Sequence, residues 1–120
     1  MRIWPDGWVM GKPVDRDDAI NMLRRLAGNV HQVYTGVTIV IPGIGTRSFV
    51  EKTDVEIVPM TDEEIAHYVD CGEPMDKAGA YAIQGQFAPF VRRISGDYYN
   101  VVGLPVSAVY KILKKYTNVI

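Results

Sequence analysis

The chain has 120 residues, 48% of them hydrophobic, with a formal net charge of −1 and a single cysteine, Cys71. That length supports one packed domain over residues 1–120, and the charge argues against a general nucleic-acid binder, which carries a basic surplus. The lone cysteine excludes an internal disulfide framework, and without a bilayer-length apolar run or a signal-peptide pattern we expect a cytoplasmic protein with no membrane partner.

The first part of the chain is typical of a tight turn followed by a helix. Pro5-Asp6-Gly7 separates two short apolar segments, a pattern that predicts a β-hairpin. Asp15 is placed to cap a helix whose apolar residues recur at helical spacing. Gly28 stands where the C-terminal cap of that helix belongs.

Two long segments rich in β-branched and aromatic residues come next. Residues 30–41 and 47–60 flank a Pro-Gly-Ile-Gly turn, and together they predict a long antiparallel pair with one face partly exposed to water. Thr61 and Glu64 then form a capping box that predicts a helix ending at Gly72.

The last part of the chain returns to strand-like composition and ends in a helix. Residues 87–94 are expected to form a strand, and Tyr98 and Tyr99 to pack in the core beside the final turn. Proline at a first helical position predicts a helix from Pro105. Its expected inward side chains are Val106, Val109, Leu113 and Tyr116. Strands and helices interleave, so we expect an α/β or α+β class.

Polar side chains in residues 72–85 and at position 12 are the candidates for chemistry. Lys12 lies between glycine and proline and would present a cation to a phosphate, unless it is only a solvated lysine at a strand exit. Asp76 and Lys77 precede small residues that admit a ligand, although a local ion pair is the alternative. The amide of Gln84 suits the mixed donor and acceptor edge of a nucleobase, unless nearby backbone satisfies it.

Other reactive residue types give no recognisable site. His31 and His67 lack a second ligand at metal-binding spacing, so both are expected to be core or surface histidines. Cys71 follows a predicted helix end, where the dipole disfavours a thiolate. The sequence contains neither a nucleophile-elbow serine nor a Walker-type phosphate loop.

Taken together, these residues resemble the Maf family of nucleoside triphosphate pyrophosphatases, once described as septum-formation inhibitors. No single motif is decisive, but their order and spacing are specific. The matching segments are Gly11-Lys12-Pro13, residues 31–37, residues 49–53, Tyr68 with Gly72-Glu73-Pro74, residues 76–81, Ile83-Gln84-Gly85 and residues 96–105.

The resemblance implies an elongated α/β fold in which helices flank a mixed sheet, and a cleft for a nucleotide. It implies hydrolysis of dTTP or UTP, or of modified pyrimidine nucleotides, to the monophosphate and pyrophosphate, with a divalent metal such as magnesium. Family motifs place Lys12, Asp76 and Lys77 at the phosphates and Gln84 at the base, with Glu51 and Glu73 behind them. A homodimer is also expected.

The sequence departs from the family pattern at its beginning. The Ser-x-Ser-Pro-Arg-Arg signature is absent, and the aspartate of an Ala-Asp-Thr motif, taken as the catalytic base, would precede Met1. Ala82 stands where glycine is usual. We therefore expect an N-terminally truncated Maf-like domain with impaired activity and no assigned catalytic residue. The alternatives are a non-catalytic nucleotide-binding or self-associating remnant, and a fragment whose function lies with a longer protein; residues 30–60 are the candidates for self-association.

Overall fold

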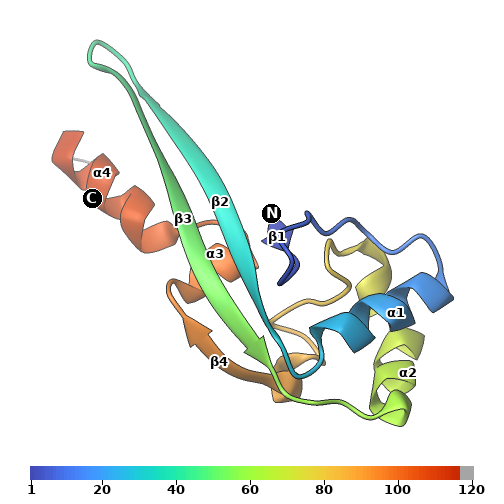
Figure 1. Cartoon of the computed structure of the whole chain (residues 1–120). Coiled ribbons are helices and arrows are strands. Elements are labelled where there is room, and N and C mark those ends of the chain that lie inside the picture. The colour runs from blue at the N-terminus through green and yellow to red at the C-terminus, as the bar shows by residue number, and fades with distance from the viewer. Residues whose placement is uncertain (117–120) are drawn as a thin grey trace.

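The computed structural model describes residues 1–116, which form an elongated molecule with principal extents of 54 × 26 × 25 Å. Its sheet has the order β1-β2-β3-β4, and Figure 1 shows helices placed around it. The strands are β1 (Arg2–Ile3), β2 (Val30–Ile41), β3 (Gly45–Ile57) and β4 (Val91–Ser95). The helices are α1 (Arg16–Leu26), α2 (Asp62–Asp70), α3 (Tyr98–Val102) and α4 (Val106–Tyr116), with short 3-10 helices η1 (Glu73–Asp76) and η2 (Ala88–Phe90). The α/β class is confirmed, and the pairings among these strands are antiparallel.

The predicted turn and first helix are confirmed. Ile3 pairs with Val9 across the turn, and Gly7 adopts the left-handed φ of +95° that its position requires. The Asp15 carboxylate accepts a hydrogen bond from the Asp18 N–H, which caps α1. At the other end, the Gly28 N–H donates to the Val58 carbonyl and ties the end of α1 to the segment after β3.

The long hairpin of β2 and β3 is the axis of the molecule. Its register pairs Val30 with Glu56 at one end and Ile41 with Gly45 at the other. β3 begins and ends earlier than the predicted 47–60, because the turn is tight and residues 58–60 leave the sheet. Side chains alternate along the end of β3, so that Thr53, Val55 and Ile57 are buried while the residues between them are partly exposed to water, as predicted.

The core lies at one end of this axis, between the sheet, α1, α2 and the loop after η1. Leu23 and Leu26 of α1 are fully buried, as are Tyr81 and Phe87 of the loop. The far end of the hairpin is instead covered on one face by α4, where Arg47 donates to the Tyr116 hydroxyl at 3.0 Å. Exposed apolar side chains at this end include Val40, Ile44 and Val50, and the predicted self-association of residues 30–60 stays a prediction.

Three expectations for the C-terminal part are wrong. Of the predicted 87–94 strand only residues 91–94 join the sheet, in β4 (Val91–Ser95), because the Ala-Pro-Phe segment before them forms η2. Tyr98 and Tyr99 are 38% and 55% exposed, since the Asp97 carboxylate caps α3 and turns Asn100 and Val101 inward instead. Val106 is also exposed, because α4 begins beyond the core.

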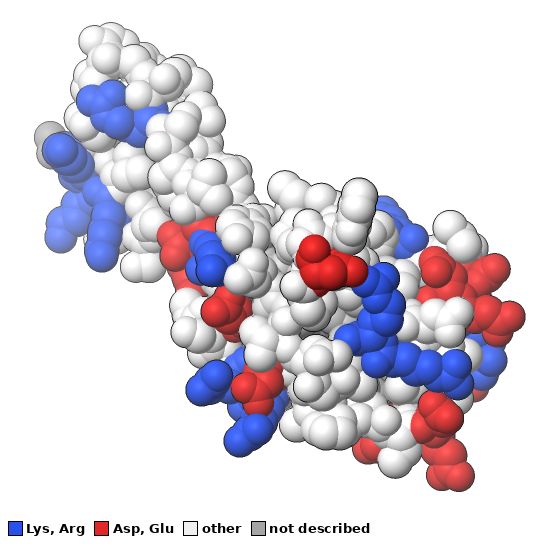
Figure 2. Space-filling model, in the orientation of Figure 1, with Lys and Arg blue, Asp and Glu red and all other residues white. Residues whose placement is uncertain are grey.

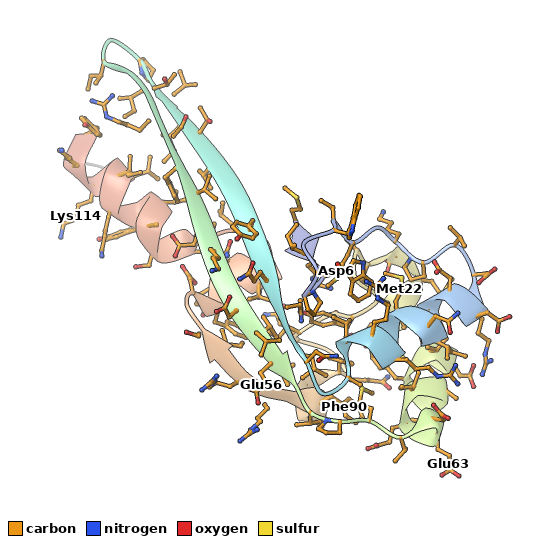
Figure 3. All side chains as sticks on the ribbon, viewed as in Figure 1. Asp6, Met22, Glu56, Glu63, Phe90 and Lys114 are labelled. Atoms are coloured by element: carbon orange, nitrogen blue, oxygen red, sulfur yellow. The ribbon has the colours of Figure 1, made fainter. Side chains whose placement is uncertain are left out.

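Charge is unevenly distributed along the molecule. Figure 2 shows lysines and arginines grouped over α4 and the hairpin tip, whereas acidic side chains gather around α1 and α2, mixed with arginines. Lys114 and Glu63 mark these opposite ends in Figure 3. Within residues 1–116, no helix is long and apolar enough to cross a membrane.

Candidate functional site

A small pocket of about 120 Å³ opens where β1, α3 and residues 77–84, here called the 77–84 loop, come together. Its lining residues are Arg2, Lys77, Ala82, Ile83, Gln84, Val101 and Val102. Two cations and an amide thus share a pocket with aliphatic walls, a combination suited to an anion that carries a flat apolar ring. A larger hollow of about 410 Å³ between α2 and η2 contains none of the predicted site residues.

The 77–84 loop takes its shape from left-handed backbone at its centre. Gly79 has φ +81° and Ala80 has φ +65°, a conformation that costs a non-glycine residue about 1 kcal/mol. A Cβ at Gly79 would lie 2.8 Å from Arg2 Cδ and 2.9 Å from Met10 Sδ, so only glycine fits there. The Gly79 N–H donates to the Gly11 carbonyl at 3.0 Å, which joins the loop to the segment that carries Lys12.

Arg2 holds one side of this loop. Its Nη1 donates to the carbonyls of Ala78 at 2.6 Å and Tyr81 at 2.5 Å, and its guanidinium stacks on the Tyr81 ring at 3.8 Å. The Tyr81 hydroxyl in turn lies 2.5 Å from His31 Nε2. Burial lowers the pKa of Arg2, lowers that of His31 to about 3 and raises that of Tyr81 to about 12, so Tyr81 and His31 are neutral near pH 7.

Glu73 supports the other side of the loop, next to Gln84. Its Oε2 accepts a hydrogen bond from the Gln86 N–H at 3.1 Å, and its carboxylate fills the space beside Gly85. The Ala82 N–H donates to the Tyr68 hydroxyl at 3.2 Å, whose pKa is raised chiefly by burial. Gln84 is thus held between two backbone anchors that side chains of other elements provide.

Replacing Gly85 with alanine is expected to displace this support. The new Cβ would lie 1.9 Å from Glu73 Oε1, so the carboxylate must move and release the Gln86 N–H. Losing that charge-assisted hydrogen bond should lower the free energy of unfolding by about 1–2 kcal/mol, measured by urea denaturation. Gly36→Ala is the matched control, because a Cβ there meets nothing within 4 Å. Equal stability of the two variants would contradict the supporting role of Glu73.

Asn100 of α3 supports the pocket from behind, a role that sequence reasoning missed. Its Nδ2 donates to the Val33 carbonyl at 3.1 Å, the Glu51 carbonyl at 3.3 Å and Thr53 Oγ1 at 3.0 Å. These bonds fix α3 to the middle of the β2–β3 hairpin, so that Val101 and Val102 face the pocket. A local signal was present, because Asp97 is a strong N-cap residue directly before the tyrosines.

The structure brings some of the predicted site residues together and leaves others apart. Lys77 and Gln84 line the pocket, although both side chains are largely exposed at its rim. Lys12 and Asp76 are exposed and do not line it. Asp76 directly precedes the loop, and Lys12 follows Gly11, whose carbonyl accepts from the Gly79 N–H. Glu51 is linked to the site only through its backbone carbonyl.

The described residues do not form a metal site by themselves. Within residues 1–116, no group of three or more histidine, cysteine, aspartate or glutamate side chains could hold a metal ion. Of the two histidines, His31 is buried and His67 is exposed, and Cys71 is a free exposed thiol. What the pocket offers to a ligand is the positive charge of Arg2 and Lys77 and the amide of Gln84.

Comparison with known proteins gives a consistent assignment. The Maf-like protein family profile matches residues 3–116. A dTTP/UTP pyrophosphatase of Carboxydothermus hydrogenoformans is 53% identical over 112 residues, which cover 92% of this chain and 60% of the relative. Proteins of the same name from Agathobacter rectalis and Geobacillus sp. are 51% and 54% identical over 89% of this chain, covering 54% and 57% of their own lengths.

The chain thus spans little more than half the length of these curated relatives. The matched residues nevertheless include the 77–84 loop and α3, which build the pocket, whereas Arg2 lies just before the match. A profile match over nearly the whole chain, joined by relatives about half identical to it, shows that this chain belongs to the Maf-like protein family.

Proposed function

We propose that this chain takes part in the hydrolysis of dTTP and UTP to the nucleoside monophosphate and pyrophosphate. The observation that carries the proposal is the meeting of Lys77 and Gln84 at one pocket, in a chain about half identical to proteins named dTTP/UTP pyrophosphatase. A cation and an amide in one pocket suit the two chemically different ends of a pyrimidine nucleotide, the phosphates and the base. In the reaction, water adds across a phosphoanhydride bond and pyrophosphate leaves.

Lys77 and Gln84 have separate tasks in this proposal. The Lys77 ammonium binds phosphate oxygens and offsets the negative charge that grows on the leaving pyrophosphate. The Gln84 amide offers both a donor and an acceptor, which complement the O4 acceptor and N3–H donor of uracil or thymine. Adenine presents the opposite pattern on its pairing edge, so the same pocket disfavours ATP only if the amide is held in one orientation.

The other predicted residues act around this pair. Lys12 and Asp76 lie at exposed positions from which they approach the triphosphate once it is bound, while Glu73 holds the backbone beside Gln84. If a divalent ion such as magnesium accompanies the triphosphate, the exposed Asp76 carboxylate is the predicted site residue that would hold it, and the ion would offset phosphate charge. Positive charge at the phosphates then comes from Lys77 and Lys12 together.

The test is nucleotide binding and pyrophosphate release by the 120-residue chain with magnesium. We expect UTP and dTTP to bind more tightly than ATP by about tenfold or more, as expected for one well-placed polar pair. Lys77→Ala should weaken UTP binding by about 10- to 100-fold, and Gln84→Leu should remove the preference over ATP. Lys111→Ala, on exposed α4, is the charge-matched control and should leave binding unchanged.

Each result bears on a different claim. Binding of UTP without release of pyrophosphate would support the non-catalytic alternative for this chain, because recognition would then be present without hydrolysis. Equal affinity for UTP and ATP in the wild type would overturn the role of Gln84. A chain that binds no nucleotide at all would overturn the proposal.

A further inference from the structure

We infer that Arg2 is a positioning residue, whose guanidinium holds the 77–84 loop in the shape that the pocket requires. The identity of the ligand rests on the proposed function, but the restraint on the loop does not. Arg2 comes from β1, the short strand beside β2, whereas the loop is more than 70 residues away in the sequence. The contact is therefore made only by the folded chain.

The hydrogen bonds of Arg2 bracket the turn in the loop. One nitrogen, Nη1, donates to the carbonyls of Ala78 and Tyr81 at 2.6 and 2.5 Å. These carbonyls lie on either side of the left-handed residues Gly79 and Ala80. A single donor that joins both sides keeps the turn closed, and hydrogen bonds from a charged donor are about twice as strong as neutral ones.

The guanidinium is itself held against a rigid support. It lies 3.8 Å from the centroid of the Tyr81 ring, which is fully buried. That ring packs against Phe87 at 4.8 Å, and its hydroxyl bonds His31 of β2 at 2.5 Å. The Tyr81 side chain is thus fixed in the core although its backbone belongs to the loop, and the guanidinium lies between this ring and the two carbonyls.

The loop depends on such an outside restraint. Ala80 has φ +65°, a left-handed conformation that is unfavourable for a residue with a side chain. Such a conformation persists only where contacts with the surrounding structure stabilise it. The Arg2 stem occupies the space that a side chain at Gly79 would need, with Cδ 2.8 Å from the position of its Cβ. The residue at position 79 is thus a glycine at the point where the Arg2 side chain approaches the loop backbone.

Arg2 also connects this restraint to the pocket. It lines the pocket together with Lys77 and Gln84, the first and last residues of the loop it holds. Opening the turn would change the distance between those two side chains, and hence the match to a ligand that touches both.

The test compares Arg2→Met, which keeps the aliphatic stem but loses the charge and donors, with the wild-type chain. Amide hydrogen exchange followed by NMR, without nucleotide, should show the N–H groups of Gly79 and Ala80 exchanging about tenfold faster or more. In a separate titration with UTP, the affinity of Arg2→Met should be lower than that of the wild type by about tenfold or more. Arg2→Lys should recover part of both effects, because lysine keeps the charge but lacks the planar fork that stacks on Tyr81.

Two controls separate a local effect from general weakening. Arg24→Met removes an exposed arginine that pairs with Asp62 far from the pocket, and should change neither readout. Val55→Ala weakens the buried core of β3, and should lower global stability without selective exchange in the loop. Selectivity for the 77–84 loop is the signature that a merely stabilising role of Arg2 would not produce.

Unchanged exchange at Gly79 and Ala80 in Arg2→Met would overturn the inference, as would faster exchange with unchanged UTP affinity. If Arg2→Met does not fold, Arg2→Lys decides the matter, and wild-type exchange in that variant would overturn the role of the guanidinium. A wild-type chain that binds no UTP would remove the proposed function. The exchange measurement would still decide whether Arg2 holds the loop.

Discussion

Replacing Asn100 with alanine is expected to lower the free energy of unfolding by about 3 kcal/mol, among the largest effects of any single change in this chain. The Asn100 side chain is 1% exposed, and its Nδ2 is shared by the carbonyls of Val33 and Glu51 and by Thr53 Oγ1. Alanine would remove the donor and leave these acceptors with fewer partners, in a place too buried for water to replace it freely.

Urea denaturation measures this loss, with Asn21→Ala as the matched control. Asn21 lies on the exposed face of α1, where the same substitution should change stability by less than about 0.5 kcal/mol. The denaturant dependence should stay the same in both variants, since neither changes the area exposed on unfolding. If Asn100→Ala lowers the free energy of unfolding by less than about 1 kcal/mol, the proposed stabilisation by these hydrogen bonds is contradicted.

The same bonds explain why the C-terminal part was harder to predict than the first helices. Caps at Asp15 and Thr61 act within four residues, so the sequence alone predicts α1 and α2 and the structure confirms both. For α3, local composition suggested buried tyrosines. The orientation of this five-residue helix is set instead by Asn100, whose partners lie 47 to 67 residues away.

The candidate site shows the same division between local and distant information. Lys77 and Gln84 were predicted from two neighbouring short motifs, residues 76–81 and Ile83-Gln84-Gly85, and both residues line one pocket. Arg2 carried no local signal, because its partners Ala78 and Tyr81 lie 76 and 79 residues away in the sequence. Motif residues could thus be found from the sequence, while the residues that hold them in place required the fold.

Lowering the pH from about 7 to about 5 is expected to cost about 2 kcal/mol of stability through His31 alone. Burial, and secondarily the positive charge of Arg2, lowers the pKa of His31 to about 3 in the folded chain, against 6.5 for the unfolded residue. Between these values the unfolded state binds a proton that the folded state does not. The contribution is therefore fully present above about pH 6.5 and is lost as pH falls, at about 1.4 kcal/mol per pH unit.

The effect is measured by urea denaturation of the wild type and His31→Gln between about pH 7 and pH 5. Both proteins contain the same carboxylates, so the contribution of these groups to the pH dependence cancels when the two free energies of unfolding are subtracted. The variant should be less stable at neutral pH but should show a shallower pH dependence, and the exposed His67→Gln should follow the wild type. Parallel curves for wild type and His31→Gln would contradict the buried neutral histidine. Because the folded chain keeps His31 neutral while its ring bonds the Tyr81 hydroxyl beneath Arg2, His31 takes up a proton in this range only when that contact opens. Acid should therefore release Gly79 and Ala80 for exchange before the helices unfold, which connects the stability of the core to the shape of the proposed nucleotide pocket.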